Sequence, residues 1–354
     1  MMSRKTIITA FAIAAAFQLH AQQVETKSST INLGQVIYRM PVTAEFELQN
    51  TSGTTLNIEN VKTSCGCTTV DYPRNGIAAG QSFKVAATYD SKQMGHFEKQ
   101  VGLYLDNDEP PVLLTLKGVV VDEIHDFAGQ YPYSIGELSI DKRDIEFDDV
   151  NVGDRPFQEI HIKNNSDKRL SPVVMHLPPY LKAEVSPTTI SPGRSGVARI
   201  TLDSEKLNTY GLVQTNIFLG NNPGDKVSQD KEISVSTIIL PNFEEMTASL
   251  LAQAPRLELS EEELMLTFGK KKRMTATITL KNTGASMLDI NSMQMFTTGL
   301  KVSLSDTHIA PGEEVKMKIT ADKKELKAAR SKPRILMITN DPKQPKRIIK
   351  VNVQ

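Results

Sequence analysis

The sequence contains almost no cysteine and no tryptophan. Its 354 residues include two cysteines, and aromatic residues make up only 6% of the total. Proteins that bind sugars usually stack them on exposed aromatic rings, so this composition argues against a carbohydrate-binding surface. The sequence also lacks recognisable catalytic or ligand-binding motifs. The histidines are scattered, the glycines occupy turns, and the acidic cluster LDNDEP lacks the regular spacing of a calcium loop. We therefore expect a protein that is not an enzyme.

The chain also has no excess charge of either sign. Lysine and arginine number 41, and aspartate and glutamate also number 41. A nucleic-acid partner requires a basic field, so none is expected. One local exception is the run GKKKR at 269–273, which lies between two apolar segments. We interpret this run as a solvated turn, in preference to a patch for a polyanion or a membrane.

Long apolar runs are absent except at the N-terminus. Arg4 and Lys5 precede an apolar run at 7–17, and Ala21 offers a small residue for cleavage. This run is typical of a secretory signal and is shorter than the roughly 20 residues of a membrane span. The alternative is a buried N-terminal helix. We predict a signal peptide at 1–21 and a mature chain with no transmembrane segment. The signal predicts an exported protein, periplasmic or extracellular. Because no cysteine follows the cleavage point, we expect that it is not a lipoprotein.

Three segments of the chain repeat the same landmarks in the same order. An asparagine ends an alternating strand, a turn glycine follows, and a second turn asparagine comes later. The first interval is 30, 29 and 30 residues in the three copies, and the second is 27, 28 and 28. This register indicates three homologous domains. The landmarks are Asn50, Gly80 and Asn107; Asn164, Gly193 and Asn221; and Asn282, Gly312 and Asn340.

Each copy has the pattern of short half-buried strands. In VTAEFEL (42–48) and MTATITL (274–280), apolar and polar residues alternate with a period of two. Short strands every 8–12 residues, separated by Asn, Gly and Pro, predict an antiparallel two-sheet sandwich. We expect the turn asparagines and glycines to accept positive φ angles. The predicted fold class is all-β, with three tandem immunoglobulin-like β-sandwich domains after a signal peptide.

The domain boundaries follow from these landmarks. The segment at 125–137 is expected to be an extended linker or an edge strand. In the connector at 241–256, Asn242 and Glu245 have the spacing of a capping box, so a short helix is predicted there. We interpret it as a linker helix packed on a neighbouring domain, in preference to a partner-binding helix. The predicted parts are the signal peptide 1–21, domains at 24–124, 138–240 and 257–354, and linkers at 125–137 and 241–256.

The first copy resembles a known family. The stretch VKTSCGCTTVDYP, the later turn IAAGQ, and the strand start formed by Gly95, Phe97 and Lys99 are similar to the bacterial secreted proteins grouped as domain of unknown function 1573. The turn AAGQ departs from the Pro-Gly turn of that family. The resemblance covers about residues 30–121. The later copies look like generic immunoglobulin-like modules of the same superfamily, related to those of cilium- and centrosome-associated proteins. The resemblance implies a sandwich fold and export, and supplies no mechanism.

The two cysteines stand one residue apart in the first copy only. By offset from the first landmark, Cys65 corresponds to Pro179 and Thr297 in the other copies. The same scaffold is thus built twice without cysteine, so the fold does not need the thiols. They are an addition to a loop, where such modules carry function.

Three alternatives remain open for this pair. The first is a Cys65–Cys67 disulfide, which Gly66 would help by allowing a tight bend. It would stabilise the domain by only about 1.5 kcal/mol in the chain-entropy model. The second is a copper or zinc site that adds Met94 and His96, although each of these is also expected as an ordinary loop or hairpin residue. The third is a free thiol, or one that pairs with another chain.

Two functions from different classes follow. The favoured one is an exported, non-enzymatic binding or scaffolding protein of the bacterial cell envelope, which contacts protein partners through tandem domains. The alternative is a thiol-redox or copper- or zinc-binding protein that uses Cys65 and Cys67. A hydrolase built on the sandwich is the least favoured hypothesis, because the sequence contains no recognisable catalytic site for one.

Overall fold

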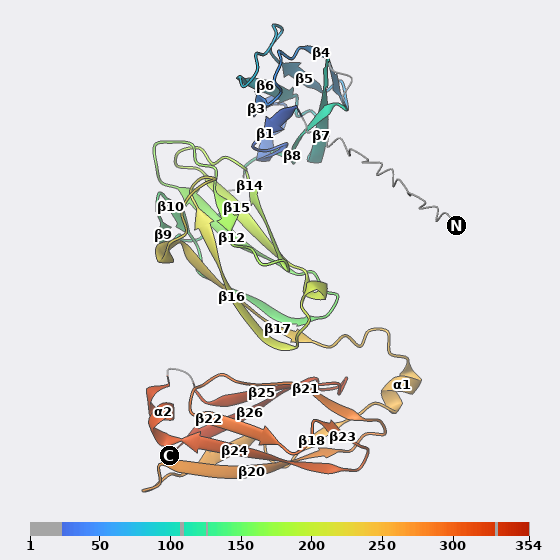
Figure 1. The fold of residues 1–354 in the computed structure, drawn as a ribbon, viewed down its shortest axis with the longest axis vertical. Coiled ribbons are helices and arrows are strands. Elements are labelled where there is room, and N and C mark those ends of the chain that lie inside the picture. The colour runs from blue at the N-terminus through green and yellow to red at the C-terminus, as the bar shows by residue number, and fades with distance from the viewer. Residues whose placement is uncertain (1–22, 107–109, 125–126, 330–331, 354) are drawn as a thin grey trace, which may run out of the picture. The chain divides into compact units, whose positions relative to one another are not determined.

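The fold is known from a computed structural model, which describes residues 23–106, 110–124, 127–329 and 332–353. The predicted signal peptide with Ala21, and the landmark Asn107, lie outside the described residues. The described chain is built almost entirely from strands, as predicted (Figure 1). None of its helices is long and apolar enough to cross a membrane. Contacts divide the chain into two compact units, one ending at Ile124 and the other covering the remainder.

The first unit contains one pair of four-stranded sheets, called sandwich 1 (24–121) below. A single hydrophobic cluster takes side chains from both sheets and fills the space between them. The first sheet contains, in order, β1 (Val24–Thr26), β3 (Val42–Asn50), β6 (Ser82–Tyr89) and β5 (Thr68–Asp71), and the second contains β2 (Thr30–Ile37), β8 (Val112–Val121), β7 (Gly95–Leu105) and β4 (Ile58–Thr63).

The second unit begins with sandwich 2 (133–240), which has its own core cluster. The segment predicted as a linker or edge strand contributes β9 at the edge of a sheet, and Phe127 stacks on the ring of His161 with centroids 3.8 Å apart. One sheet contains β14 (Leu181–Ser186), β15 (Ser195–Leu202), β12 (Phe157–Asn164), β10 (Leu138–Ile140) and β9 (Tyr133–Ile135), and the other contains β11 (Asp144–Asn151), β17 (Glu232–Leu240), β16 (Gly211–Gly220) and β13 (Val173–Met175); short 3-10 turns are η1 (Ser204–Lys206) and η2 (Gln229–Lys231).

The same unit continues with sandwich 3 (257–353), around a third core cluster. Two short helices accompany it, α1 (Ala248–Ala252) before its first strand and α2 (Lys323–Ala328) after β24. One sheet contains β18 (Leu257–Leu259), β20 (Arg273–Asn282), β24 (Glu314–Asp322) and β22 (Leu300–Leu304), and the other contains β19 (Glu263–Leu266), β26 (Lys346–Val353), β25 (Arg334–Thr339), β21 (Leu288–Met295) and β23 (His308–Ile309).

The predicted alternation of apolar and polar residues is confirmed in the cores. In β3, Ala44, Phe46 and Leu48 are buried while the residues between them are exposed. In β20, Ile278 and Leu280 are buried in the same way. These residues face the opposite sheet, because successive side chains of a strand point to opposite faces. The period-two pattern therefore located the strands that form the cores.

One strand pair in each sandwich is parallel, which the purely antiparallel prediction missed. These pairs are β2 with β8, β11 with β17, and β19 with β26. In sandwich 1 the chain first pairs β1 with β3 in one sheet and then crosses to the other sheet as β2. The last strand of each sandwich is thereby flanked by an entering segment that runs in the same direction. This covers an edge that would otherwise be open to pairing.

The turn glycines behave as predicted, but the first-landmark asparagines do not. Gly80, Gly193 and Gly312 have φ angles of 74°, 70° and 80°. The asparagines are absent from the positive-φ residues and are fully buried. Their side-chain amides bond to carbonyl groups of the following turn and of the strand before the turn glycine. The prediction for the asparagines was wrong because it considered only the backbone of the turn, and not carbonyl groups brought in from 26 or 27 residues away.

The connector at 241–256 also differs from its prediction. Helix α1 begins after Thr247, whose hydroxyl accepts a hydrogen bond from Leu250 N, and not after Asn242. Asn242 Oδ1 instead accepts from Glu244 N in a preceding turn. No residue of α1 is buried. The interpretation as a helix packed on a neighbouring domain is therefore wrong.

Sandwiches 2 and 3 meet through a small apolar cluster. Leu240 of β17 packs with Leu336 and Ile338 of β25, which point away from the core of sandwich 3. Gln294 of β21 accepts from Leu212 N at 2.6 Å and donates to Leu212 O at 3.1 Å. Division of this unit at 241–256 stays a prediction, although each pair of sheets has its own core.

Candidate functional site

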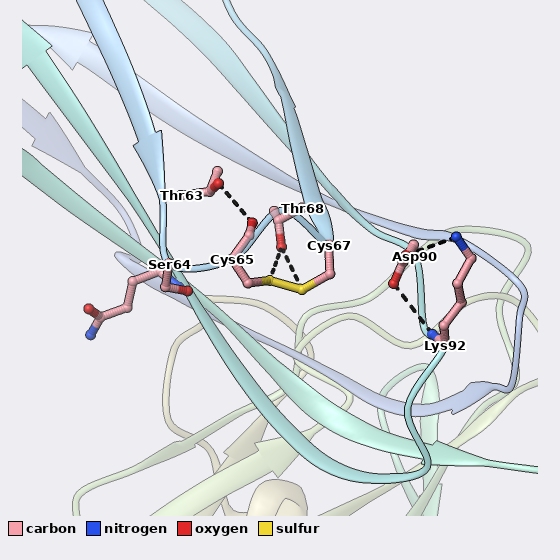
Figure 2. The surroundings of a disulfide bond; sticks show 8 residues. Thr63, Ser64, Cys65, Cys67, Thr68, Asp90 and Lys92 are labelled. Carbon is pink, nitrogen blue, oxygen red and sulfur yellow. Dashed lines mark hydrogen bonds and ion pairs between the residues drawn. A yellow bond between two sulfur atoms is a disulfide. The ribbon is translucent and has the colours of Figure 1, made fainter.

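The two cysteines lie in a tight reversal of the chain in sandwich 1, called the hairpin below, although the strands that it connects belong to different sheets and are not paired with each other. Strand β4 ends at Thr63 and β5 begins at Thr68, and Cys65 and Cys67 lie in the turn between them. The structure joins the two sulfur atoms in a disulfide, with the Cα atoms 5.2 Å apart (Figure 2). This separation falls within the ordinary range for disulfides. Of the three alternatives, this geometry is compatible with the local bridge, and the state of the pair in the protein stays a prediction.

Hydrogen bonds fix the turn around the bridge. Thr63 Oγ1 donates to Cys65 O at 2.9 Å, and Asp90 N donates to Cys67 O at 3.1 Å. The hydroxyl of Thr68 lies 3.7 Å from Cys65 Sγ and 4.0 Å from Cys67 Sγ, as Figure 2 shows. Both sulfur-bearing residues are half-buried, and Cys67 packs against the core cluster. The bridge is therefore rigidly held while one side of it faces solvent.

Gly66 is the exposed residue between the two cysteines. It does not have a positive φ, and a Cβ added to it would meet no atom within 4 Å. Neither the φ angle of Gly66 nor the space around it therefore requires a glycine at the bend, in contrast to the prediction. A side chain at this position would point into solvent, so the tip of the hairpin can be labelled without disturbing the bridge.

Two neighbouring loops complete this end of sandwich 1. They are 38–41, between β2 and β3, and 90–94, between β6 and β7. Ser91 is fully buried and donates from Oγ to Ile37 O and Met40 O, at 3.1 and 2.8 Å. Arg39 N donates to Ser91 O at 3.1 Å. We call the set 38–41, 64–67 and 90–94 the hairpin end.

Backbone strain is concentrated at the hairpin end. Arg39 and Ser91 have φ angles of 59° and 49°, and within the described chain only one other residue besides glycine, His176, has a positive φ. Such conformations cost free energy and persist where the surrounding structure enforces them. Ser204 makes the equivalent hydrogen bonds in sandwich 2, to Asn151 O and Asp154 O, without a positive φ. The strain is therefore a property of this end and not of the fold.

The surface of the hairpin end combines apolar and charged side chains. Met40 and Met94 are 59% and 55% exposed. Asp90 pairs with Lys92 at 3.2 Å. Beneath the loops, Tyr89 stacks on Phe97, and burial together with the nearby charge of Asp90 raises the pKa of its phenol. Flexible exposed methionines beside a rigid turn are typical of protein-binding surfaces.

The structure does not bring both predicted additional metal ligands, Met94 and His96, to the cysteine sulfur atoms. Met94 lies in the loop before β7, whereas His96 is the second residue of that strand, after Gly95, whose φ is 95°. The hairpin borders β7 at Gln100, whose N–H donates to Ser64 Oγ. His96 is four residues away, which is roughly 13 Å along a strand. Within the described residues, no group of three or more His, Cys, Asp and Glu side chains is placed to hold a metal ion.

Backbone hydrogen bonds align the hairpin with its counterparts in the other sandwiches. Asp90 N bonds to Cys67 O as Asp203 N does to Tyr180 O and Asp322 N does to Gly299 O. Likewise, Thr68 N bonds to Cys65 O as Leu181 N does to Pro178 O. The counterpart of Cys65 in sandwich 2 is therefore Pro178 and not Pro179, because that copy is one residue shorter here.

Comparison with solved structures supports the fold. A protein of unknown function from Porphyromonas gingivalis W83 is similar over 62% of this chain and 100% of its own, at 22% identity and a TM-score of 0.50. The Escherichia coli chaperone DraB covers 61% of this chain and 96% of its own, at 13% identity and a TM-score of 0.22. The Pseudomonas aeruginosa chaperone CupB2 has a TM-score of 0.20 at 12% identity, over 60% of this chain and 99% of its own. These last two scores are too low to support an inference.

Comparison at the level of sequence families is more informative. No curated protein matches the chain. The sequence model of a family described as protein of unknown function (DUF1573) matches residues 24–120 and again residues 258–353. The second match corrects the expectation that the family resemblance stops with the first copy. Since sandwich 3 contains no cysteine, the match does not depend on the Cys-Gly-Cys turn.

Proposed function

The chain belongs to the DUF1573 family of proteins of unknown function, and from that premise we propose that it is an exported, non-enzymatic protein that binds a protein partner in the bacterial cell envelope. The hairpin end of sandwich 1 is the binding surface. Tandem sandwich domains suit such a role, because each domain has its own core and offers loops at both ends.

Export is supported by the sequence alone. The order of charged, apolar and small residues before Ala21 is that of a cleaved signal, and no cysteine follows it for lipid attachment. Export to the periplasm or outside the cell would also place Cys65 and Cys67 in an oxidising compartment, where a disulfide persists. Labelling of the two thiols in freshly isolated protein, with and without prior reduction, tests this point.

We base the proposal on the hairpin end because it differs from the corresponding ends of sandwiches 2 and 3. Only this copy combines a bridged turn, two positive-φ residues besides glycine and two exposed methionines. The bridge adds little stability, since its loop is so short. It does lower the conformational freedom of the tip, so less entropy is lost when a partner binds. A rigid tip with apolar flanks is suited to recognition.

The contacts of two histidines in the described chain are compatible with the proposed non-enzymatic role. His161 and His308 each bond to an aspartate, Asp141 at 3.0 Å and Asp289 at 2.7 Å. Among the described residues, neither ring forms a hydrogen bond with a serine or cysteine that it could activate as a nucleophile. Each pair lies on a sheet surface or a strand end of the second unit, whereas the hairpin end belongs to the first unit.

Site-specific photo-crosslinking in intact cells tests the proposed surface. A photoreactive residue at Gly66 is expected to capture one envelope protein, because a side chain there points into solvent. The matched control is Gly53, in the turn after β3 at the opposite end of sandwich 1, which is also exposed and has no atom within 4 Å of an added Cβ. Equal capture from both positions, or none from position 66, would contradict the proposal.

A thiol-redox function is the second candidate, favoured by the solvent-facing side of the bridge. A thiolate of a partner dithiol would attack Cys65 Sγ, forming a mixed disulfide and releasing Cys67 as a thiolate near the Thr68 hydroxyl. The partner's second thiol would then release Cys65, leaving the partner oxidised and this pair reduced. Thiol titration and copper and zinc analysis of the exported protein test both this function and metal binding. If a Cys65→Ser, Cys67→Ser variant restores every phenotype of a deletion strain, this candidate is excluded.

A further inference from the structure

One end of sandwich 3 gathers positive charge from two distant parts of the chain. The loop between β19 and β20 carries Lys270, Lys271 and Lys272, and α2 carries Lys323, Lys324 and Lys327. Lys323 N donates to Lys272 O, and Lys323 Nζ donates to Gly269 O, both at 2.9 Å. Figure 1 shows α2 at one end of this sandwich. We call these six lysines the lysine cluster.

The charge of the lysine cluster is not neutralised within the described chain. None of the six lysines forms an ion pair there, and five of them are exposed. Arg273 does pair with Asp322, at 3.1 Å, and Glu325 is the other acidic residue of this end. Seven cations therefore stand against two carboxylates, in a chain whose total charge is zero. Like charges held this close repel, so the arrangement costs stability unless an anion binds it.

Most cations at the corresponding ends of the other sandwiches are paired with carboxylates, and Arg39 of sandwich 1, which lies over the ring of Tyr38, is the exception among the described residues. In sandwich 2, Arg155 pairs with Glu205 and Asp203, and Lys206 also pairs with Asp203. In sandwich 1, Lys92 pairs with Asp90. The fold therefore does not require a basic end, and the lysine cluster is specific to sandwich 3.

We propose that the lysine cluster binds the phosphate headgroups of an anionic phospholipid membrane. The free cations are all lysines, whose flexible, hydrated ammonium groups suit diffuse attraction to a charged surface. Arg273, which follows Lys272 as the first residue of β20, could bind one phosphate with a fork of hydrogen bonds, but it is held by Asp322. Met265 and Val353 are 56% and 39% exposed where the parallel strands β19 and β26 run toward this end, and they offer apolar contact with the bilayer. This proposal does not depend on a partner at the hairpin end.

Vesicle sedimentation of the chain from Gln22 onward tests the proposal. We expect binding to vesicles of phosphatidylglycerol and phosphatidylcholine, none to phosphatidylcholine alone, and release in 0.5 M salt, since salt screens exposed charges. A triple Lys270→Gln, Lys271→Gln, Lys272→Gln variant should bind about 100-fold more weakly, because each lysine near a membrane surface contributes about fivefold to binding. A Lys324→Gln, Lys327→Gln variant should lose about 10- to 50-fold.

The matched control removes the same charge from scattered positions. Lys168→Gln, Lys182→Gln, Lys226→Gln changes three exposed lysines of sandwich 2 and should alter binding less than threefold. An equal loss in the control, or equal binding to both kinds of vesicle, would overturn the proposal. Binding that 10 mM inorganic phosphate or a soluble acidic peptide abolishes at constant ionic strength would overturn it as well, because a bilayer surface would then not be the preferred ligand. Thermal melting of each variant confirms that it is folded, and loss of lysines should leave the melting temperature unchanged or raised.

Discussion

At the scale of single residues, three buried asparagines hold one turn in each sandwich. Asn164 Nδ2 donates to Lys168 O at 2.7 Å and to Ile190 O at 2.9 Å, while its Oδ1 accepts from Ser166 N at 2.9 Å. Asn50 and Asn282 make the equivalent bonds. These amides pair buried backbone groups that neither sheet can reach, which explains why the residue recurs in every copy.

Replacement of Asn164 by alanine is expected to destabilise the second unit by about 2–4 kcal/mol, because backbone groups that it pairs would stay buried without partners. Urea unfolding followed by fluorescence or circular dichroism measures the change. Asn216→Ala is the control, since its amide bonds to Glu232 on the surface and its loss should cost under about 1 kcal/mol. Equal effects of the two variants would contradict the structural role of Asn164.

His308 provides a prediction about pH. The hydrogen bond to Asp289, at 2.7 Å, raises the pKa of the His308 imidazole, and the charges of Asp289 and Asp306 add to this. A raised pKa in the folded state means that the protonated ring stabilises the fold below its ordinary pKa, near 6.5. That contribution is lost as the pH rises through the raised value. NMR titration should show a pKa above 6.5 that falls in Asp289→Asn, and an unchanged value in that variant would refute the assignment.

At the scale of elements, the same loop is used differently in the three sandwiches. An aspartate at or just after the end of β6, β15 or β24 donates its backbone N–H to the carbonyl of Cys67, Tyr180 or Gly299, respectively. The turn backbone is therefore common to all copies, while its side chains are free to differ. The connector helix α1 shows the opposite case, in which the local sequence forms a turn of helix that packs on nothing.

Leu250 and Leu251 of α1 are 54% and 41% exposed. A Leu250→Gln, Leu251→Gln variant is expected to change the free energy of unfolding by less than about 0.5 kcal/mol, because little apolar surface is lost from the interior. Leu326→Gln in α2 is the contrasting change, since Leu326 is buried in the core of sandwich 3 and its replacement should cost several kcal/mol. A large loss of stability in the α1 variant would show that this helix does pack on a neighbour.

At the scale of the whole molecule, sandwiches 2 and 3 share one compact unit because their surfaces are joined. Strand β25 is buried on both faces, with Ile335 and Met337 in the core of sandwich 3 and Leu336 and Ile338 in the cluster with Leu240. The two hydrogen bonds between Gln294 and Leu212 are directional and therefore favour one orientation of β21 relative to β16. A cluster of this size couples the two sandwiches energetically, so they should unfold together.

Ile338→Asp should break this coupling, because an unpaired carboxylate would be buried between the sandwiches. Differential scanning calorimetry is expected to show one transition for the second unit in the unchanged chain and two in the variant. Met265→Asp serves as the control, since Met265 is exposed on β19, a strand of the same sheet. A single unshifted transition in the Ile338 variant would refute the coupling.

The sequence predicted the cysteine turn of the candidate site, but it did not predict how the neighbouring residues are arranged around that turn. The uniqueness of Cys65 and Cys67 among the copies singled out the turn, and the fold puts them at the tip of a hairpin. The roles given to Gly66, Met94 and His96 were less accurate, since Gly66 is not sterically required and Met94 lies in the loop before β7, outside the strand that holds His96. Ser91 was missed, although its counterpart Ser204 makes the same hydrogen bonds, because one serine in a loop gives no periodic signal.

The sequence by itself determined the strands, the turn glycines and the threefold repeat, because alternation and positive φ are local properties of a few adjacent residues. Only the tertiary structure decided what distant segments do together. It buried the landmark asparagines, covered Leu336 and Ile338 from a second sandwich, ran each entering strand parallel to the last, and placed the lysines of α2 beside those of 269–273. Each of these depends on contacts between residues from 26 to more than 80 positions apart, which no local pattern records.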